Sequence, residues 1–199
     1  DKRLDEEFSK VIFEGPEEEL TLTANTQPAI LTTSVAAWEI LNAEGIVPDV
    51  VAGHSLGEYS AVVAAGGMSL EDAAWSVRRR GQLMQEAVPV GEGAMAALIG
   101  LEPEVVKEVC EASAQGQVVS MANINSSSQI VIAGHAGAVD RAVELANEKG
   151  AKKAIKLQVS APFHCSLMKP AQDGMVEVLS QVEISDLKMP LINNADVNM

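Results

Sequence analysis

One stretch limits the possible folds more than any other: an apolar run, Val50-Val51-Ala52, leads directly into Gly53-His54-Ser55-Leu56-Gly57. A segment rich in alanine follows, which indicates a strand, a sharp turn and then a helix. Gly-x-Ser-x-Gly in this context is typical of the nucleophile elbow, whose strained turn pushes the serine hydroxyl out of the sheet. The helix N-terminus would also supply free backbone N–H groups for an oxyanion, so we predict that Ser55 is a nucleophile. Both glycines are expected to be sterically required, because side chains two positions either side of the serine would clash in so tight a turn.

The amino-acid composition favours an α/β fold. The 199 residues can form one domain of moderate size, or a domain that carries an insertion. Hydrophobic residues make up 47% of the chain but aromatic residues only 3%, so the core must be built from aliphatic side chains and methionine. That balance suits parallel strands covered by helices better than an aromatic-rich β-sandwich.

Charge and cysteine content exclude several classes of protein. A net charge of −14 argues against nucleic acid or an anionic membrane as the main partner. No apolar run approaches the roughly 20 residues of a membrane span, and no signal peptide is visible. Two cysteines, Cys110 and Cys165, give neither a disulfide framework nor a metal-ligand spacing. We therefore expect free thiols, no bound metal and a cytoplasmic location.

Helix signals flank the serine motif on both sides. Residues 1–26 are acidic and are expected to be irregular, apart from a turn into a short helix over residues 15–20. Thr26 is a candidate N-cap, with Pro28 in the first turn of a helix over 29–44. Further helices are predicted over 58–65 and 69–87.

The helix over 69–87 carries an arginine in an unusual position. Its inward stripe contains Leu70, Ala73, Ala74, Val77, Gly81 and Met84. Arg80 lies on the flank of this stripe. A charge there must reach a cleft or a partner, because burying it alone is costly, although its long stem also allows it to extend to solvent.

The second half of the chain has a different pattern, with short strands and helices in regular alternation. These are predicted over 94–99 (strand), 103–114 (helix), 117–124 (strand), 129–133 (strand), 136–149 (helix) and 152–159 (strand). The βαββαβ order is that of a ferredoxin-like subdomain. We predict an α/β fold in which residues 92–158 form this subdomain, inserted into an incomplete, hydrolase-like parallel-sheet domain made of residues 1–91 and 159–199.

A serine nucleophile needs a base, and the sequence offers three histidines. His54 directly precedes Ser55, and adjacent side chains on a strand or elbow point apart, so we expect it to pack beside the elbow. His135 lies in a glycine-flanked turn of the insert, where we expect it to be solvated. His164 remains as the candidate base.

No aspartate completes a Ser-His-Asp triad in a convincing way. Between Ser55 and His164, where a hydrolase would carry its acid, Asp72 reads as a helix cap and Asp140 as an exposed helix residue. The imidazole is then expected to be oriented by a backbone carbonyl or an amide, either of which can fix its tautomer.

Several motifs together carry a resemblance that covers essentially the whole chain. They are the stretch from Gly53 to Ala61, Gln27-Pro28-Ala29, Arg80-Gly81-x-x-Met84-Gln85, and the pair Phe163-His164 after the insert. The chain resembles the malonyl-CoA:acyl carrier protein transacylases of type II fatty acid synthesis. The acyltransferase domains of polyketide synthases share the same pattern.

The resemblance implies a set of roles. Ser55 would form a malonyl ester, His164 would act as base and then as acid, and the Leu56 N–H would contribute to the oxyanion hole. Arg80 would pair with the free carboxylate of the malonyl group, for which its planar fork is suited. Residues near the substrate would be Arg80, Gln27, His54, Asn125 and Phe163. Helix-start and turn roles remain open for Gln27 and Asn125, respectively.

The resemblance also implies the substrates and partners. These are malonyl-CoA and a phosphopantetheinylated acyl carrier protein, with no cofactor. The bulky ring of Phe163 would disfavour an α-methyl branch, by about 1–3 kcal/mol. Because carrier proteins of this family are acidic, a local basic patch is expected. Its candidates are Arg78, Arg79, Lys152, Lys153 and Lys156, unless these are only dispersed solvated charges.

The chain departs from the family pattern at both ends. Family members begin with a strand and a glutamine-containing loop that donates a second oxyanion N–H, and they supply a carbonyl for the histidine from a later segment. We therefore expect a truncated chain of weak or no activity, because one oxyanion donor contributes a factor on the order of 10²–10³ in rate. The alternatives are a serine esterase or thioesterase, a fragment of a polyketide synthase acyltransferase domain, and a non-catalytic fragment that docks the carrier.

Overall fold

The computed structural model describes residues 1–159, 161–195 and 197–198. The chain forms two compact units, one made of residues 1–82 with 174–199 and the other of residues 83–173. Helices and strands are mixed in the chain, with a parallel sheet in the first unit and an antiparallel sheet in the second. This agrees with the expected α/β class.

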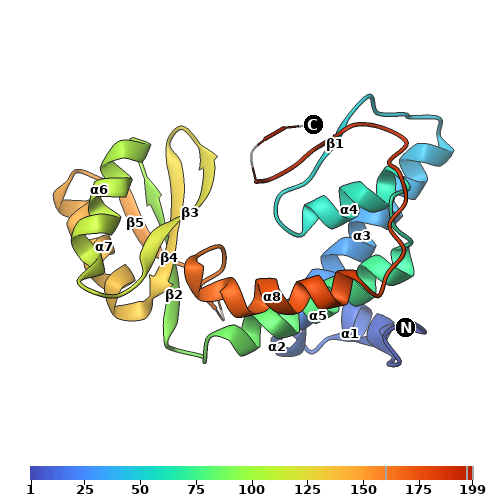
Figure 1. The fold of residues 1–199 in the computed structure, drawn as a ribbon, viewed down its shortest axis with the longest axis horizontal. Helices are drawn as coiled ribbons and strands as arrows, with labels where there is room; N and C mark the ends of the chain where they lie inside the picture. Colours follow the sequence, from blue (N-terminus) through green and yellow to red (C-terminus); the bar gives the residue numbers. More distant parts are fainter. Residues whose placement is uncertain (160, 196, 199) are drawn as a thin grey trace. The chain divides into compact units, whose positions relative to one another are not determined.

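The first unit consists mainly of helices and contains one short parallel strand pair, with β1 at an edge of the unit (Figure 1). Its elements are α1 (Phe8–Glu14), α2 (Glu17–Leu20), α3 (Thr23–Ala43), β1 (Val51–Ala52), α4 (Gly57–Ala64), β6 (Leu191–Ile192), and parts of α5 (Leu70–Ala87) and α8 (Lys169–Leu179). In the sheet, Val51 lies opposite Leu191 and Ala52 opposite Ile192. Leu31, Val35 and Val77 are nearly inaccessible to solvent and join α3 and α5 in one apolar cluster, which also includes Leu56 at the start of α4.

The beginning of α3 differs from the expectation. The helix begins at Thr23, and Pro28 lies inside it rather than in its first turn. Thr26 does not cap the helix, because its hydroxyl donates to the carbonyl of Leu20 at 2.7 Å. Thr26 and Pro28 have the spacing that is typical of a helix start, but the helix begins before both of them, at Thr23. The helix α1, within a segment expected to be irregular, was also missed.

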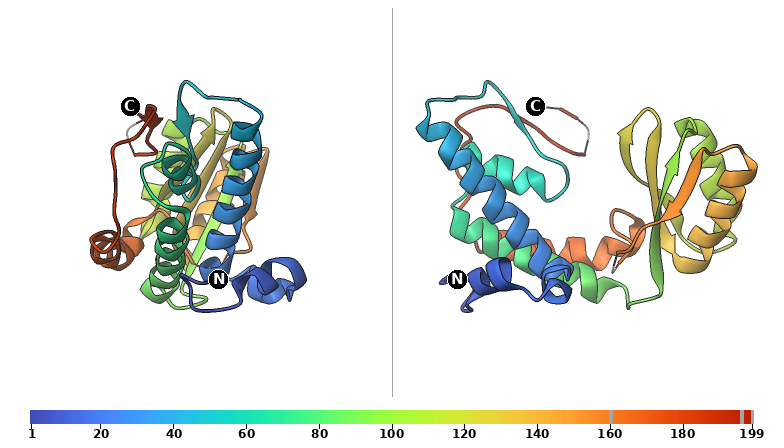
Figure 2. Two further views of the ribbon diagram at one scale, coloured as in Figure 1. Left: turned by 90° about the vertical axis from the view of Figure 1, so that its right-hand side faces the viewer. Right: turned by 180° about the vertical axis from the view of Figure 1, so that it is seen from behind.

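The second unit is an antiparallel sheet with helices on one face (Figure 2). Its elements are β2 (Gly93–Ile99), α6 (Pro103–Ala114), β3 (Val119–Ser126), β4 (Gln129–His135), α7 (Ala136–Glu148), β5 (Lys153–Lys156) and a 3₁₀ turn (Ser166–Met168). The strands are ordered β3-β4-β2-β5, and all neighbours are antiparallel. Alternate residues divide the sheet into two faces. Ala96 and Ile132 pack under α6 and α7, whereas Ala97 and Val131 face the segment that carries Phe163.

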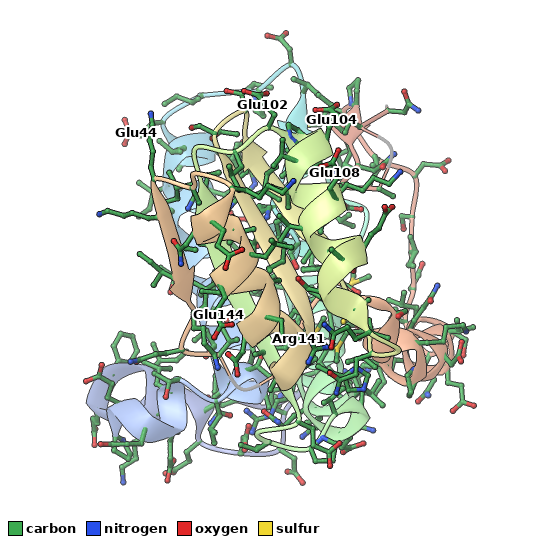
Figure 3. All side chains as sticks on the ribbon, turned by 90° about the vertical axis from the view of Figure 1, so that its left-hand side faces the viewer. Glu44, Glu102, Glu104, Glu108, Arg141 and Glu144 are labelled. Atoms are coloured by element: carbon green, nitrogen blue, oxygen red, sulfur yellow. The ribbon has the colours of Figure 1, made fainter. Side chains whose placement is uncertain are left out.

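Arg141 links the two helices of the second unit and is labelled in Figure 3, together with Glu102, Glu104 and Glu108 near and along α6. Its Nε donates to the carbonyl of Ser113 at 2.9 Å, and its Nη2 donates to the carbonyl of Ala114 at 3.1 Å. These are carbonyls in the last turn of α6, which have no partner within the helix. The cation therefore satisfies the helix C-terminus and complements its dipole.

Candidate active site

Ser55 adopts the backbone conformation expected of an elbow nucleophile. Its φ is +52°, in the left-handed region, which costs a residue other than glycine about 1–2 kcal/mol. A side chain at Gly53 would place its Cβ 2.0 Å from the backbone of Gly57, so only glycine fits at this position. At Gly57 a Cβ would meet no atom within 4 Å, and the expectation that both glycines are sterically required is wrong for this one. The steric requirement therefore applies to one glycine of the motif: Gly53 must lack a side chain because the Gly57 backbone lies against it, whereas the position of a Cβ on Gly57 is open.

The turn presents backbone N–H groups in sequence at the start of α4. The Ser55 N–H donates to the side chain of Asn194 at 2.8 Å, and the Gly57 N–H donates to the carbonyl of His54 at 2.9 Å. Leu56 is the N-cap of α4, and its side chain is buried in the core cluster of the first unit. That burial anchors the turn, and the N–H of Leu56 lies directly after the nucleophile, at a helix N-terminus that favours negative charge.

Arg80 reaches the nucleophile from α5. Its Nη2 donates a hydrogen bond to the Ser55 Oγ at 3.0 Å, and its Nη1 donates to the Gln27 Oε1 at 2.7 Å. The guanidinium carbon lies 5.9 Å from the ring centre of Tyr59. Burial lowers the pKa of Arg80 from its ordinary value, while the nearby Tyr59 and Glu58 act in the opposite direction. An arginine nonetheless remains protonated in proteins, so the site holds a cation beside the serine.

Gln27 fixes one end of this cation. The residue is only 6% exposed, and its Nε2 donates to the Thr23 Oγ1 at 3.0 Å while its Oε1 accepts from Arg80. A glutamine amide has one acceptor and two donors, and here the buried acceptor is matched to the charged partner. The helices α3 and α5 and the elbow therefore bring Gln27, Arg80 and Ser55 together. The sequence predicted that Arg80, a charge on the flank of an apolar stripe, needs a partner or a cleft, and Gln27 and Ser55 are the partners.

The residues predicted in the second unit lie on two segments. Asn125 is exposed on β3. Phe163 is partly buried and packs against Met84 and Val88 on one side and against the free face of the sheet on the other. His164 is exposed and has a φ of +59°, a left-handed conformation that only a minority of residues other than glycine adopt.

The other two histidines lie in different surroundings. His54, on the elbow, is exposed rather than packed against it. His135 is partly buried, and its Nδ1 accepts a hydrogen bond from the Val118 N–H at 2.9 Å. The expectation of a solvated His135 is therefore wrong, because His135 ends β4 and is hydrogen-bonded to Val118, directly before β3. An imidazole nitrogen that accepts a hydrogen bond is unprotonated, which fixes the tautomer of this side chain.

Comparison with known proteins places this arrangement in a family. The family of acyl transferase domains matches residues 2–197. The chain belongs to the acyl transferase domain family.

Two curated relatives of this acyl transferase domain carry the same name. The chain is 52% identical over 200 residues to a malonyl CoA-acyl carrier protein transacylase from Bacillus subtilis, covering 100% of the chain and 63% of the relative. It is 50% identical over 185 residues to the protein of that name from Escherichia coli K12, covering 92% and 60%. The chain thus spans less than two thirds of the length of these relatives.

Solved structures agree with the fold of the acyl transferase domain. The malonyl CoA-acyl carrier protein transacylase from Coxiella burnetii matches with a TM-score of 0.96 at 48% identity, over 98% of this chain and 62% of that one. A type II polyketide synthase acyl-carrier protein in complex with its malonyl-transacylase contains a chain that matches with a TM-score of 0.97 at 47% identity, over 100% and 64%. The mixed α/β architecture, with one parallel and one antiparallel sheet, is therefore that of the acyltransferase fold.

Two polar residues of the acyl transferase domain site were missed by sequence reasoning. Asn194 and Glu58 contact each other and the elbow: the Asn194 N–H and Nδ2 donate to the Glu58 Oε2 at 2.8 and 2.9 Å. Asn194 lies 139 residues from Ser55 along the chain. Glu58 was visible in the sequence, directly after the motif, but no local pattern indicates that Asn194 reaches it.

The described residues of the acyl transferase domain lack two kinds of feature. Among them, no three His, Cys, Asp or Glu side chains are grouped so that they could hold a metal ion. No helix in that part of the chain is long and apolar enough to span a membrane. Cys110 and Cys165 are free thiols.

Proposed function

We propose that this acyl transferase domain moves a malonyl group from coenzyme A to the phosphopantetheine thiol of an acyl carrier protein, through an ester on Ser55. One observation carries the proposal: a partly buried Arg80 donates to the nucleophile itself, at 3.0 Å. A cation at this position gives the site a preference for an acyl group with its own negative charge. The two curated relatives described above are both named malonyl CoA-acyl carrier protein transacylase, which supports the same substrate.

The proposed reaction has two balanced halves. The Ser55 Oγ attacks the thioester carbonyl of malonyl-CoA while its proton passes to His164, and collapse of the tetrahedral intermediate breaks the C–S bond. The coenzyme A thiolate leaves and takes the proton from the imidazolium. In the second half the carrier thiol gives its proton to His164 and attacks the ester, and Ser55 leaves as the alkoxide and recovers that proton.

Charge recognition is assigned to Arg80. Its Nη1 is already held by Gln27, so the guanidinium plane is oriented before the substrate enters. The malonyl carboxylate would replace the Ser55 hydroxyl as the acceptor for the Nη2 once that oxygen is esterified. The exchange keeps the arginine bonded in both states, which limits the cost of moving a buried cation.

The oxyanion of the tetrahedral intermediate is assigned to the Leu56 N–H, which lies at the N-terminus of α4. The hydrogen bond from this N–H to the carbonyl oxygen, and the interaction of that oxygen with the helix dipole, both strengthen as negative charge develops on the oxygen. We assign selection against an α-methyl branch to Phe163, whose ring is wedged between two apolar clusters and so has little freedom to withdraw. His54 and Asn125 remain proposed substrate contacts.

We further propose that residues 92–158 form a ferredoxin-like insert in a catalytic domain made of residues 1–91 and 159–199. The strand order β3-β4-β2-β5, with α6 and α7 on one face, supports this division. The proposed partners are malonyl-CoA and an acidic carrier protein, in the cytoplasm and without nucleic acid. Two residues of the proposed basic patch already have acidic partners, since Arg78 pairs with Glu6 at 2.5 Å and Lys156 with Asp140 at 2.6 Å.

Intact-mass measurement after incubation with malonyl-CoA tests the proposal. We expect one malonyl adduct that is absent in Ser55→Ala and is discharged by a phosphopantetheinylated carrier protein. Steady release of free malonate without accumulation or transfer would identify an esterase instead. Complete absence of an adduct on the folded wild-type chain, even after prolonged incubation that would reveal weak activity, would contradict the proposal and favour a non-catalytic docking role.

A further inference from the structure

Asn194 contacts the elbow through every polar atom of its side-chain amide. Its Oδ1 accepts the Ser55 N–H at 2.8 Å, and its Nδ2 donates to the carbonyl oxygen of Gly53 and to the Glu58 Oε2, the latter at 2.9 Å. Its backbone N–H donates to the same carboxylate oxygen at 2.8 Å. Within the described part of the chain, the hydrogen-bond partners of Asn194 lie between Gly53 and Glu58, the residues that form and follow the nucleophile turn.

The hydrogen bonds of the Asn194 side chain follow directly after the backbone hydrogen bonds between β1 and β6. The parallel pairing of β1 with β6 ends at Ala52 and Ile192, just before the chain bends into the elbow. The amide of Asn194 then takes the place of a strand peptide: it accepts from one backbone N–H and donates to the carbonyl two residues earlier. Only an amide offers an acceptor and a donor in this arrangement, because a carboxylate has no donor and a hydroxyl is too short.

The segment that the amide holds is the strained one. Ser55 has a φ of +52°, which a serine keeps only where its surroundings determine it. Pinning the Gly53 carbonyl and the Ser55 N–H fixes the peptide groups that lead into the serine and, with them, the direction of its Cα–Cβ bond. The Glu58 carboxylate ties the same amide to the first turn of α4, so the turn is held from both of its ends.

The amide also determines which backbone N–H is open to a substrate. The Ser55 N–H is taken by Asn194, whereas the described residues give no acceptor for the N–H of Leu56. An oxyanion beside Ser55 then meets the Leu56 N–H at the head of α4.

We propose that Asn194 is a positioning residue: its side-chain amide holds Ser55 in the left-handed conformation and reserves the Leu56 N–H for the oxyanion. The inference rests on the proposed function only in that Ser55 is taken as the acylated residue. Asn194 acts through Ser55 and makes no contact with the acyl group.

The test uses two reagents on the purified full chain. A fluorophosphonate reacts with an activated serine and has no carboxylate, so it reports on nucleophile geometry alone; malonyl-CoA reports on geometry and charge recognition together. Both adducts are followed by intact mass. We expect Asn194→Ala to slow labelling at saturation by about 10-fold or more with both reagents, while the half-saturating malonyl-CoA concentration changes less than 3-fold because Arg80 is untouched. Asn198→Ala is the matched control and should label at the wild-type rate, because Asn198 lies in the same segment and bonds to Asn193 through its backbone carbonyl, which the substitution keeps.

The Asn194→Asp variant keeps the inference testable if Asn194→Ala fails to fold. A protonated carboxyl group has the acceptor and donor of an amide, whereas the ionised form lacks the donor and repels Glu58. The fluorophosphonate rate of Asn194→Asp relative to wild type should therefore rise several-fold as the pH falls from 8 to 5. A flat ratio, or wild-type rates in folded Asn194→Ala, would overturn the inference.

The two proposals fail in different ways. If the wild-type chain takes the fluorophosphonate but no malonyl group, and Asn194→Ala slows the former, the positioning role stands and the malonyl assignment falls. If malonyl transfer proceeds equally in wild type and Asn194→Ala, the malonyl assignment stands and the positioning role falls.

Discussion

The Nη2 of Arg80 donates a hydrogen bond to the Oγ of Ser55 across 3.0 Å. The nucleophile therefore contacts a cation without any acyl group bound. A guanidinium that donates to a hydroxyl oxygen stabilises the alkoxide more than the alcohol, because the negative form accepts the stronger bond. Arg80 thus has two uses in the proposed reaction: it favours ionisation of Ser55 and then receives the malonyl carboxylate.

Replacing Arg80 should separate charged from neutral acyl groups. Hydrogen bonds to charged groups contribute about 1.5–3 kcal/mol, so Arg80→Ala is expected to lower kcat/KM for malonyl-CoA by about 10- to 150-fold. The loss for acetyl-CoA should be smaller, because only the contact with the Ser55 hydroxyl is removed. Arg80→Lys keeps the charge but not the planar fork of the guanidinium, so its kcat/KM for malonyl-CoA should lie between those of wild type and Arg80→Ala. Acylation rates measured by intact mass check this.

Arg79→Ala is the matched control for these variants. Arg79 lies one residue earlier on α5 and donates to Gln82 rather than to the elbow. Arg79→Ala should leave kcat/KM for malonyl-CoA and for acetyl-CoA within about 2-fold of the wild-type values. Equal losses of malonyl and acetyl transfer in Arg80→Ala would contradict the carboxylate role.

The two glycines of the elbow should respond differently to alanine. In Gly53→Ala the new Cβ would lie 2.0 Å from the Gly57 backbone, and the turn must open to accept it. We expect a loss of about 1–3 kcal/mol in the free energy of unfolding, together with loss of labelling at Ser55. In Gly57→Ala the methyl group meets open space at the first position of α4, where alanine is a better helix former by up to about 1 kcal/mol. Urea unfolding of both variants distinguishes them, and comparable destabilisation would show that the motif is sterically symmetric.

Local sequence patterns predicted those parts of the molecule that local interactions determine. The helix over 103–114 was placed correctly because Pro103 fits the first helical turn and apolar residues recur at helical spacing. The elbow was predicted from its glycines, and the need of Arg80 for a partner was predicted from its position beside an apolar stripe. Each of these inferences uses residues within one turn or one element.

The sequence did not reveal contacts between distant segments. Asn194 reaches the elbow across 139 residues, and Gln27 reaches Arg80 across 53. The solvated state expected for His135 was wrong for the same reason, because its partner, Val118, lies directly before another strand, β3. Hydrogen-bond partners of this kind depend on the assembled sheet and on helix packing, which no spacing within a single segment encodes.

Arg141 should stabilise the second unit by holding the end of α6. It donates to two backbone carbonyls there and to the side chain of Gln117 at 3.0 Å. Arg141→Met keeps most of the apolar stem but removes the hydrogen bonds to the Ser113 and Ala114 carbonyls, the second of which still accepts the Gln117 N–H at 2.8 Å. We therefore expect the free energy of unfolding to fall by about 1–3 kcal/mol. Glu144→Ala, one helical turn further along α7, is the control and should stay within about 0.5 kcal/mol. Urea denaturation followed by circular dichroism measures both, and equal effects would contradict the capping role.

Cys110 should make stability depend on pH in the alkaline range. The side chain lies in the core cluster under α6 and α7, and burial, with a smaller contribution from Glu111, raises the pKa of its thiol from 9.0 to about 11. Between pH 9 and pH 11 the thiol is therefore ionised in the unfolded chain and protonated in the folded one. The unfolded state then binds fewer protons, so the free energy of unfolding falls as the pH rises. This contribution is fully present below about pH 9 and is lost as the pH rises through 11.

Cys110→Ala isolates the contribution of this thiol from those of the other ionisable groups of the chain. The variant loses some packing at every pH, and that cost is constant. The stability advantage of wild type over Cys110→Ala should therefore shrink between pH 8.5 and pH 10.5, as measured by urea unfolding at half-unit steps. Below pH 8.5 the advantage should be flat, since the thiol is protonated in both states. An advantage that stays constant up to pH 10.5 would mean that the folded chain ionises Cys110 as readily as the unfolded chain does.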